Sequence, residues 1–419
     1  MSSAVAVAPT VEGKSAQKTR PEHLQVAAFV GVFGLLLFGP LAFGAVESWA
    51  IFTLEAGSIS VLALWAIGQA IRGELHVTRS SVFWPMLAFG GVVLFQLAFH
   101  QTAYRAATVA NLLLYGSYGL LCFLLVQSLR RSWQLKTLLA GFSLYGFVLA
   151  TFALIQGIIS NGKLYWIRTP RLGGWIYGPY VNHNHYAGLI EMLTPFALVM
   201  FLSPCVRRQH NAMAALAGGM MVSTIFISGS RGGMLAFAVQ MAVLAAFLIS
   251  RNSSGKMALA VGAFFLFAFG LLAWLGSKEL VNRMTSIPVD VRTELSGGTR
   301  LSIDRDCLRM FLHKPLTGWG LGTFPEVYPR FRSFYTTSFV DKVHNDYLQF
   351  LVETGAIGFL VMIWFLLAVW QAAIQKLKFW PTDHKTDLAL AATLGMSGIL
   401  AHSLVDFNLQ IPANAALFF

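Results

Sequence analysis

The sequence predicts an all-α polytopic membrane protein with about 11–12 transmembrane helices. Of its 419 residues, 56% are hydrophobic and only 11% are charged, whereas soluble domains are about one quarter charged. Many apolar runs reach the roughly 20 residues with which a helix crosses a bilayer. Because these runs are continuously apolar and do not alternate, they exclude the strands of an outer-membrane barrel.

The chain opens with a polar, basic segment that lacks the apolar core of a signal peptide. We therefore expect residues 1–24 to form a disordered cytoplasmic tail. Apolar spans then fill residues 25–276, a long polar loop occupies 277–346, and residues 347–419 hold the last spans and the start of a possible twelfth. The eleven spans lie near 25–45, 50–71, 82–99, 108–129, 135–159, 186–202, 213–229, 233–250, 257–276, 352–374 and 387–405.

The basic residues fall on alternate connections between these spans. With the N-terminus in the cytoplasm, clusters such as Arg130–Arg131 and Arg207–Arg208 lie in short cytoplasmic loops, as the positive-inside rule expects. Much of the net charge of +12 therefore sets topology and does not indicate a nucleic-acid partner. The long loop 277–346 then lies on the outer face of the membrane.

This outer loop is basic and has the pattern of an ordered segment. Residues 299–312 carry apolar side chains at helical spacing, which predicts a helix. Arg305 and Arg309 lie one turn apart on another face of that helix, and Arg330 follows after a turn rich in proline and glycine. The loop thus presents several cations to an anionic ligand.

The tenth span opens with His344, Asn345 and Asp346. The partial positive charge of a helix N-terminus favours a neutral imidazole, which is the form that a general base needs. The alternative is that the three residues only cap the helix, since asparagine and aspartate are preferred N-cap residues.

Arg231 stands between two spans, in the stretch ISGSRGGM. An arginine at membrane depth costs on the order of 3 kcal/mol, so it is a functional candidate. The neighbouring serines and glycines leave backbone amides uncovered, and a guanidinium can bind phosphate oxygens in a bidentate manner. The alternative is a tight turn with an arginine that extends to the interface.

The sixth span opens with Asn184 and His185, preceded by several aromatic residues that suit interface anchoring or sugar stacking. The spacing of His183 and His185 permits zinc, but no third ligand is evident. Asp304 and Asp306 fall within the predicted helix 299–312, where we expect them on a solvated face. All of these polar groups map to one side of the membrane, which indicates a site for an anionic, partly sugar-like substrate that enters from the lipid.

Other residues of the last two spans are expected to be structural. Glu353 lies on the opposite helix face from His344 and suits a partnership with an arginine. Gly355 and Gly358 suit close helix packing. Asp406, near the outer end of the eleventh span, is expected to pair with an outer arginine.

Together these residues resemble the O-antigen ligase and O-antigen polymerase superfamily. The resemblance covers most of the chain from about residue 160 onward, whereas the first 150 residues match only as apolar spans. It rests on His344-Asn345-x-Tyr347-Leu348 followed by Glu353-x-Gly355-x-x-Gly358, on Arg300 with Pro315-Leu316-x-Gly318-x-Gly320, on Ser230-Arg231-Gly232-Gly233 and on Asn184-His185-x-Ala187.

The resemblance implies a bacterial inner-membrane enzyme with a large periplasmic loop that contains short helices. Such an enzyme transfers a glycan from undecaprenyl diphosphate to an acceptor such as lipid A-core, without a metal ion or a nucleotide sugar. It implies that Arg231 and Arg300 bind the diphosphate and that His344 takes the proton of the acceptor hydroxyl. Further candidates for substrate binding are Arg305, Arg309, Arg330, Asn184, His185 and Tyr347.

Three alternative functions remain open at this point. An O-antigen or exopolysaccharide polymerase would join one lipid-linked repeat to another, and a protein O-oligosaccharyltransferase would glycosylate protein serines. A transporter of anionic lipids belongs to a different class and would need charged groups along a path through several helices. Only Glu55 and Glu191 lie well within spans, which disfavours transport.

Overall fold

The computed structural model describes residues 16–170, 175–251, 299–336 and 339–419, with a few single positions between 251 and 299. Over these residues the chain is helical, and three short 3-10 turns lie at Phe43–Ala45, Tyr328–Arg330 and Asn408–Gln410. The α-helices are α1 (Ala16–Leu41), α2 (Ser48–Arg72), α3 (Phe83–Ala98), α4 (Arg105–Ser128), α5 (Ser132–Ile158), α6 (His183–Leu202), α7 (Arg208–Ile227), α8 (Arg231–Ser250), α10 (Thr299–His313), α11 (Phe324–Val327), α12 (Asp346–Leu377), α13 (His384–His402) and α14 (Pro412–Phe418).

The predicted all-α membrane fold is confirmed. Among the described residues, 8 helices are long and apolar enough to cross a membrane, and the apolar α3 is shorter. A chain in hydrocarbon must satisfy its backbone amides within each segment, which is why the apolar runs form helices. The predicted span 257–276 and the first part of the long loop, 277–298, lie outside the described residues. Helix α1 begins at Ala16, within the segment expected as a tail, while residues 1–15 are not among those described.

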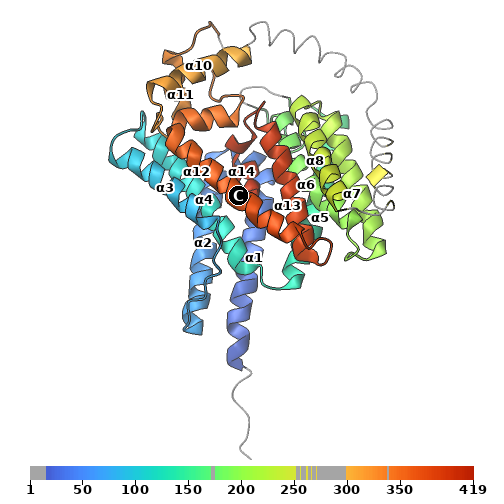
Figure 1. The fold of residues 1–419 in the computed structure, drawn as a ribbon. Helices are drawn as coiled ribbons and strands as arrows, with labels where there is room; N and C mark the ends of the chain where they lie inside the picture. The colour runs from blue at the N-terminus through green and yellow to red at the C-terminus, as the bar shows by residue number, and fades with distance from the viewer. Residues whose placement is uncertain are drawn as a thin grey trace, which may run out of the picture.

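Helix α6 is the centre of the bundle. Every residue from His185 to Val199 is buried, and α5, α7 and α13 pack around it. The approach of α13 is close, because a Cβ on Gly395 would lie 3.1 Å from the carbonyl oxygen of Met192. Figure 1 shows α6, α7 and α8 on one side of the molecule, α3 and α4 on the other, and α12 crossing between them.

Helices α10 and α11 and the turn Tyr328–Arg330 form a cap on the bundle, at the end opposite to the beginning of α1 (Figure 1). The helix predicted over residues 299–312 is confirmed as α10. Its apolar face forms a small core with the rest of the cap and with α12. The buried members of this core are Ile303, Cys307, Met310, Phe324, Val327, Tyr328, Val343 and Val352.

Residues 402–410, which we call the 402–410 segment, connect α13 to α14. The segment begins as a tight turn, since the amides of Val405 and Asp406 donate to the carbonyl of His402 at 3.0 and 3.1 Å. Helix α14 then returns into the bundle, where the buried Asn414 donates to the carbonyl of His185 at 3.0 Å. The segment is therefore held at both ends by buried helices.

Candidate functional site

His344 lies beside Asp406 of the 402–410 segment. Nδ1 of His344 is 3.4 Å from Oδ1 of Asp406, and 31% of the His344 side chain is exposed against 2% for Asp406. The imidazole also packs edge-on against Phe407, with ring centroids 5.1 Å apart. One side of the ring is thus fixed by a buried carboxylate while part of its surface remains accessible.

The residue that caps α12 is Asn345 and not His344. Oδ1 of Asn345 accepts the backbone amides of Tyr347 and Leu348 at 3.1 and 3.2 Å. The capping requirement of the helix is met without the imidazole. His344 is therefore free of a local structural role at the helix start.

Asp406 has a histidine partner instead of the arginine that the sequence suggested. Burial of its carboxyl raises the pKa, but contact with His344 and the charges of His185, His344 and His402 lower it, so the pKa of Asp406 lies below its ordinary value. An ionised carboxylate in this position can orient the imidazole and stabilise the imidazolium that forms when His344 accepts a proton.

Arg300 and Arg231 both stand next to this turn. Arg300, at the start of α10, donates from Nη1 to the carbonyl of Val405 at 3.3 Å. Arg231 is the first residue of α8, which Ser230 caps by accepting the amide of Gly233 at 3.1 Å. The adjacent Gly232 packs so closely on the turn that an added Cβ would overlap Nε2 of His402 and meet Val405.

Three parts of the chain that are far apart in sequence therefore meet on residues 402–406. The start of α8 packs on His402 and Val405, Arg300 binds the carbonyl of Val405, and His344 contacts Asp406. Both arginine side chains are exposed. Two arginines and one histidine from distant parts of the sequence therefore lie next to the same turn.

The start of α6 contributes to the same neighbourhood. His185 is buried, and its ring lies 4.7 Å from that of Phe407, so Phe407 is flanked by His185 and His344. Asn184 is half-buried beside it, and its backbone amide donates to the N-cap Asn182 at 2.9 Å. These contacts place the predicted Asn184–His185 pair next to the His344–Asp406 pair.

The other candidate substrate-binding residues lie differently. Arg305, Arg309 and Arg330 are exposed on the cap, and none of the contacts in the described part of the chain joins them to the 402–410 segment. Nη1 of Arg309 lies 3.5 Å from the buried Asp306. The hydroxyl of Tyr347 donates to the carbonyl of Leu400 at 2.7 Å, so it is already engaged by α13.

Asp306 is a buried anchor of the cap, whereas the sequence suggested a solvated face. It is 0% exposed, and its Oδ2 accepts the amide of Ser333 at 2.9 Å and lies 3.3 Å from the hydroxyl of Tyr328. Helical spacing alone did not reveal this, because the covering residues come from a later turn of the same loop.

Glu353 binds backbone amides instead of an arginine. Its Oε2 accepts the amide of Gly322 at 2.8 Å, and its Oε1 accepts that of Phe324 at 3.3 Å. This buried carboxylate therefore clamps the turn between α10 and α11 onto α12. A carboxylate that accepts several backbone amides is a structural solution for a charge at this depth.

Gly355, the first of the two glycines after Glu353, serves the same junction. Gly355 interrupts α12 with φ +66°, and the amide of the next residue donates to the carbonyl of Pro315 at 2.8 Å. A Cβ on Gly355 would overlap the carbonyl of Leu316, and one on Gly358 would overlap Thr354 of the same helix. At Gly355 the predicted helix–helix contact is thus replaced by insertion of a loop, whereas the role of Gly358 in helix packing stays a prediction.

A buried pair in the bundle was not predicted. Glu191 of α6 and His402 of α13 are both 0% exposed, and Nδ1 of His402 lies 3.2 and 3.1 Å from the two carboxylate oxygens. Gln240 of α8 donates to the carbonyl of Glu191 at 2.7 Å. A glutamate within an apolar span was the available signal, but its partner lies in a different span and could not be assigned.

The fold and the site define a multi-pass membrane protein with a polar, cationic centre at the cap end of its bundle. Residues 216–363 match the model of the O-antigen ligase family, and the matched stretch includes Arg231, Arg300 and His344.

A protein of Haemophilus influenzae that is described as uncharacterized is also similar to this chain. The two are 23% identical over 239 residues, which is 54% of this chain and 58% of that protein. The chain therefore spans less than two thirds of this curated relative.

Proposed function

We propose that this protein transfers a glycan from undecaprenyl diphosphate to lipid A-core at the periplasmic face of the bacterial inner membrane. One observation carries the proposal: the start of α8, Arg300 and His344 all meet on residues 402–406. A base with a buried carboxylate partner and two exposed guanidinium groups provides what a displacement of diphosphate by a hydroxyl needs. The match of residues 216–363 to the O-antigen ligase family supports the reaction class.

In the proposed reaction, the acceptor oxygen attacks the anomeric carbon of the donor sugar. The new glycosidic bond forms as the bond between the anomeric carbon and the phosphate oxygen breaks. The acceptor hydroxyl gives its proton to His344, and Asp406 stabilises the imidazolium. Attack from the face opposite to the leaving group inverts the anomeric configuration.

Arg231 and Arg300 have the complementary role on the leaving group. The departing undecaprenyl diphosphate gains negative charge, and fixed guanidinium groups stabilise that charge without reorganising. Arg231 is the first residue of α8, so the positive end of the helix dipole lies beside it. We expect this charge compensation to suffice without a metal ion.

The distribution of basic residues supports one direction of the chain in the membrane. With a cytoplasmic N-terminus, the short loops that hold Arg130, Arg131, Arg207 and Arg208 lie on the cytoplasmic side. The cap and the 402–410 segment then lie in the periplasm. This is the compartment in which a lipid-linked glycan and lipid A-core would meet.

The test is transfer in proteoliposomes that contain undecaprenyl-diphosphate-linked glycan, with or without lipid A-core, in the presence of EDTA. His344→Ala is expected to lower the rate at least about 100-fold, and Arg231→Ala and Arg300→Ala to lower it strongly. His76→Ala and Arg79→Ala, at exposed positions of another loop, serve as matched controls with unchanged rates. Full activity of folded His344→Ala and Arg231→Ala proteins would refute the mechanism.

The same experiment separates the alternative acceptors. Longer lipid-linked chains formed without lipid A-core would identify a polymerase, and glycan on added protein would identify a protein O-oligosaccharyltransferase. Movement of the donor across the bilayer without any transfer would favour an anionic lipid transporter.

A further inference from the structure

The turn that follows α10 is held between two apolar helices. Nε2 of Gln96, in α3, donates to the carbonyl of Thr317 at 2.6 Å. On the other side, the amide of Ile357 in α12 donates to the carbonyl of Leu316 at 3.2 Å. Helix α12 is long and apolar enough to cross a membrane. The turn therefore lies beside the cap end of a membrane-spanning helix.

Exposed apolar side chains flank this turn at the ends of α3 and α10 and on α12. We call them the apolar rim, which consists of Phe95, Phe99, Leu312, Leu316, Ile357 and Leu360. Leu312 and Leu316 are 72% and 64% exposed. Leucines with this exposure, gathered with other apolar residues, mark a surface that a partner or a membrane covers.

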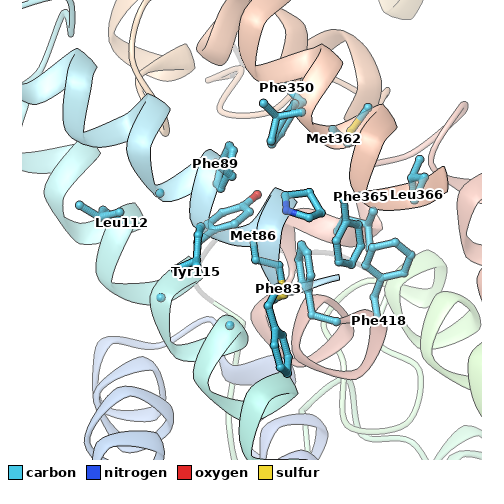
Figure 2. Close-up of a pocket in the computed structure, with 18 of the residues that line it drawn as sticks. Phe83, Met86, Phe89, Leu112, Tyr115, Phe350, Met362, Phe365, Leu366 and Phe418 are labelled. Carbon is cyan, nitrogen blue, oxygen red and sulfur yellow. The ribbon is translucent and has the colours of Figure 1, made fainter. Parts of the chain in front are cut away.

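The apolar rim continues the apolar surface of the helices next to it. A groove of about 750 Å3 runs between α3, α4 and α12, and its lining is mainly apolar. Figure 2 shows Phe89 of α3 with Phe350 and Met362 of α12 around this groove. Leu94 also lines the groove, and the next residue, Phe95, begins the rim. Because charged side chains avoid the lipid face of a spanning helix, this continuous apolar surface is typical of contact with hydrocarbon.

Basic side chains border the apolar rim. Nη1 of Arg105 donates to the carbonyl of Leu97 at 3.0 Å, and Nζ of Lys314 donates to that of Gln101 at 3.3 Å. Both cations are therefore fixed next to the C-terminal end of α3. Each bond uses one donor, and a guanidinium and an ammonium group have several. Arg309, near the end of α10, is 63% exposed and adds a third positive charge.

The stretches of chain that form the apolar rim carry no acidic residue. Neither aspartate nor glutamate occurs in residues 75–190, 307–325 or 354–382. Of the acidic residues that flank these stretches near the cap, Asp306 and Glu353 are buried and Glu326 of α11 is exposed. The accessible charge around the rim is therefore mainly positive. Cations beside apolar side chains match the phosphate layer and the outer hydrocarbon of an anionic leaflet.

We propose that the apolar rim and its cations seat the cap on the anionic phospholipids of the leaflet at the cap end of the bundle. The leucines and phenylalanines of the rim lie at the boundary between acyl chains and headgroups, and Arg105 and Lys314 bind phosphate oxygens. This contact holds α10, whose first turn carries Arg300, at a fixed height on the bilayer. It goes beyond the proposed function, and its tests do not read glycan transfer.

The first test measures the depth of the apolar rim in proteoliposomes of phosphatidylcholine and phosphatidylglycerol. Leu312→Cys and Leu316→Cys, each labelled with a fluorescent dye, are compared with Tyr335→Cys, at an 87% exposed position of the cap. Tyr335 is the matched control because the nearby Ser333 binds Asp306 of α10 and not a spanning helix. The parent protein, labelled in the same way, gives the contribution of its own three cysteines.

We expect phospholipids with a nitroxide near the headgroup to quench most of the fluorescence at Leu312 and Leu316, and little at Tyr335. No quenching at Leu316, or equal quenching at all three positions, would overturn the proposal. Disulfide-linked dimers formed through Leu316→Cys at low protein density would assign the rim to a second copy of the chain and would also overturn it.

The second test measures the preference for an anionic headgroup. Phosphatidylglycerol and phosphatidylcholine, each with a photoreactive diazirine near the head of one acyl chain, are compared in phosphatidylcholine vesicles. We expect the phosphatidylglycerol probe to label the peptide that holds residues 312–316 more strongly, by about fivefold for each basic residue that reaches the surface, which corresponds to about 1 kcal/mol.

Two double variants assign this preference to the cations of the apolar rim. Arg105→Gln with Lys314→Gln should abolish the preference while labelling by the phosphatidylcholine probe is retained. Arg330→Gln with Arg332→Gln removes the same charge from exposed positions elsewhere on the cap and should keep it. Equal labelling by the two probes in the parent, or an equal loss of preference in both double variants, would overturn the proposal.

Discussion

The buried pair of Glu191 and His402 is expected to hold the turn that carries Asp406. The pair joins α6 to the last residue of α13, and both side chains are 0% exposed. The carbonyl of His402 accepts the amides of Val405 and Asp406, so displacement of His402 moves the residues that contact Arg300 and His344. We therefore predict that breaking the pair lowers both stability and transfer.

The expected magnitude follows from the burial of the pair. Removing one partner of a buried pair leaves an unpaired polar or charged group and costs about 3–5 kcal/mol. At roughly 2 °C per kcal/mol for a chain of this size, Glu191→Ala and His402→Ala are each expected to lower the melting temperature by roughly 6–10 °C. Because the second substitution removes a group that is already unpaired, the double variant is expected to melt close to the single variants.

The assay is a double-mutant cycle on protein in nanodiscs, read by melting temperature and by transfer rate. His402→Asn is the conservative variant, since its amide can donate to Glu191 from nearly the position of Nδ1, and we expect it to restore most of the rate lost in His402→Ala. His313→Ala, at an exposed position in the last turn of α10, is the control for loss of a histidine. Additive single effects, or a His402→Asn protein as inactive as His402→Ala, would refute the reasoning.

Four further outcomes are expected. Asp406→Asn should lower transfer in proteoliposomes at least about 100-fold with the fold retained, because an amide cannot stabilise the imidazolium of His344; an unchanged rate would remove Asp406 from the mechanism. Folding lowers the pKa of Asp406, so its ionised carboxylate stabilises the protein above the ordinary aspartate pKa of about 3.9. This stabilisation is lost as the pH falls below that pKa, and the melting temperature of the parent should then fall more steeply than that of Asp406→Asn. Gly355→Ala should destabilise the protein by at least about 1–3 kcal/mol through backbone strain and overlap with Leu316, whereas Gly34→Ala should leave thermal melting unchanged or slightly raised. Asp306→Asn should lower the free energy of local unfolding of the cap by about 1–3 kcal/mol. Limited proteolysis within residues 299–336 would detect this change, and an unchanged digestion pattern would contradict the anchoring role of Asp306.

The helices were predictable because the bilayer leaves the chain few choices. An apolar run in hydrocarbon must satisfy its own amides, so it becomes a helix whatever its neighbours are. Helix α10 was predictable for a related reason, since the apolar spacing of Ile303, Cys307 and Met310 fits one helix face. The start of α1 differs from the prediction, because the helix begins within the segment expected as a tail. A polar sequence before an apolar span is compatible with a disordered tail and also with a helix that extends beyond the membrane.

The partners of the polar residues could not be predicted to the same degree. Asp406 and Glu353 were each expected to meet an arginine, and they meet a histidine and two backbone amides instead. A buried charge near a helix end requires a hydrogen-bonding or charged partner. The sequence shows that the charge is present but does not show which group becomes its partner. Which group arrives depends on turns such as the one after α10, whose path is set by close contacts at Gly318 and Gly355.

Under the proposed function, the 402–410 segment combines fixed chemistry with a variable substrate. A displacement requires the base, the reacting carbon and the leaving group to keep a tight alignment. Buried polar contacts hold the segment at His402 on one side and, on the other, at Asn414 of the adjoining α14. Such contacts are costly to break in a medium of low dielectric. Arg305, Arg309 and Arg330 are instead exposed on the cap, where long side chains adapt to a ligand at little cost. We therefore expect substitutions at these three arginines to change which glycan is preferred, and substitutions around the segment to change the rate for every glycan.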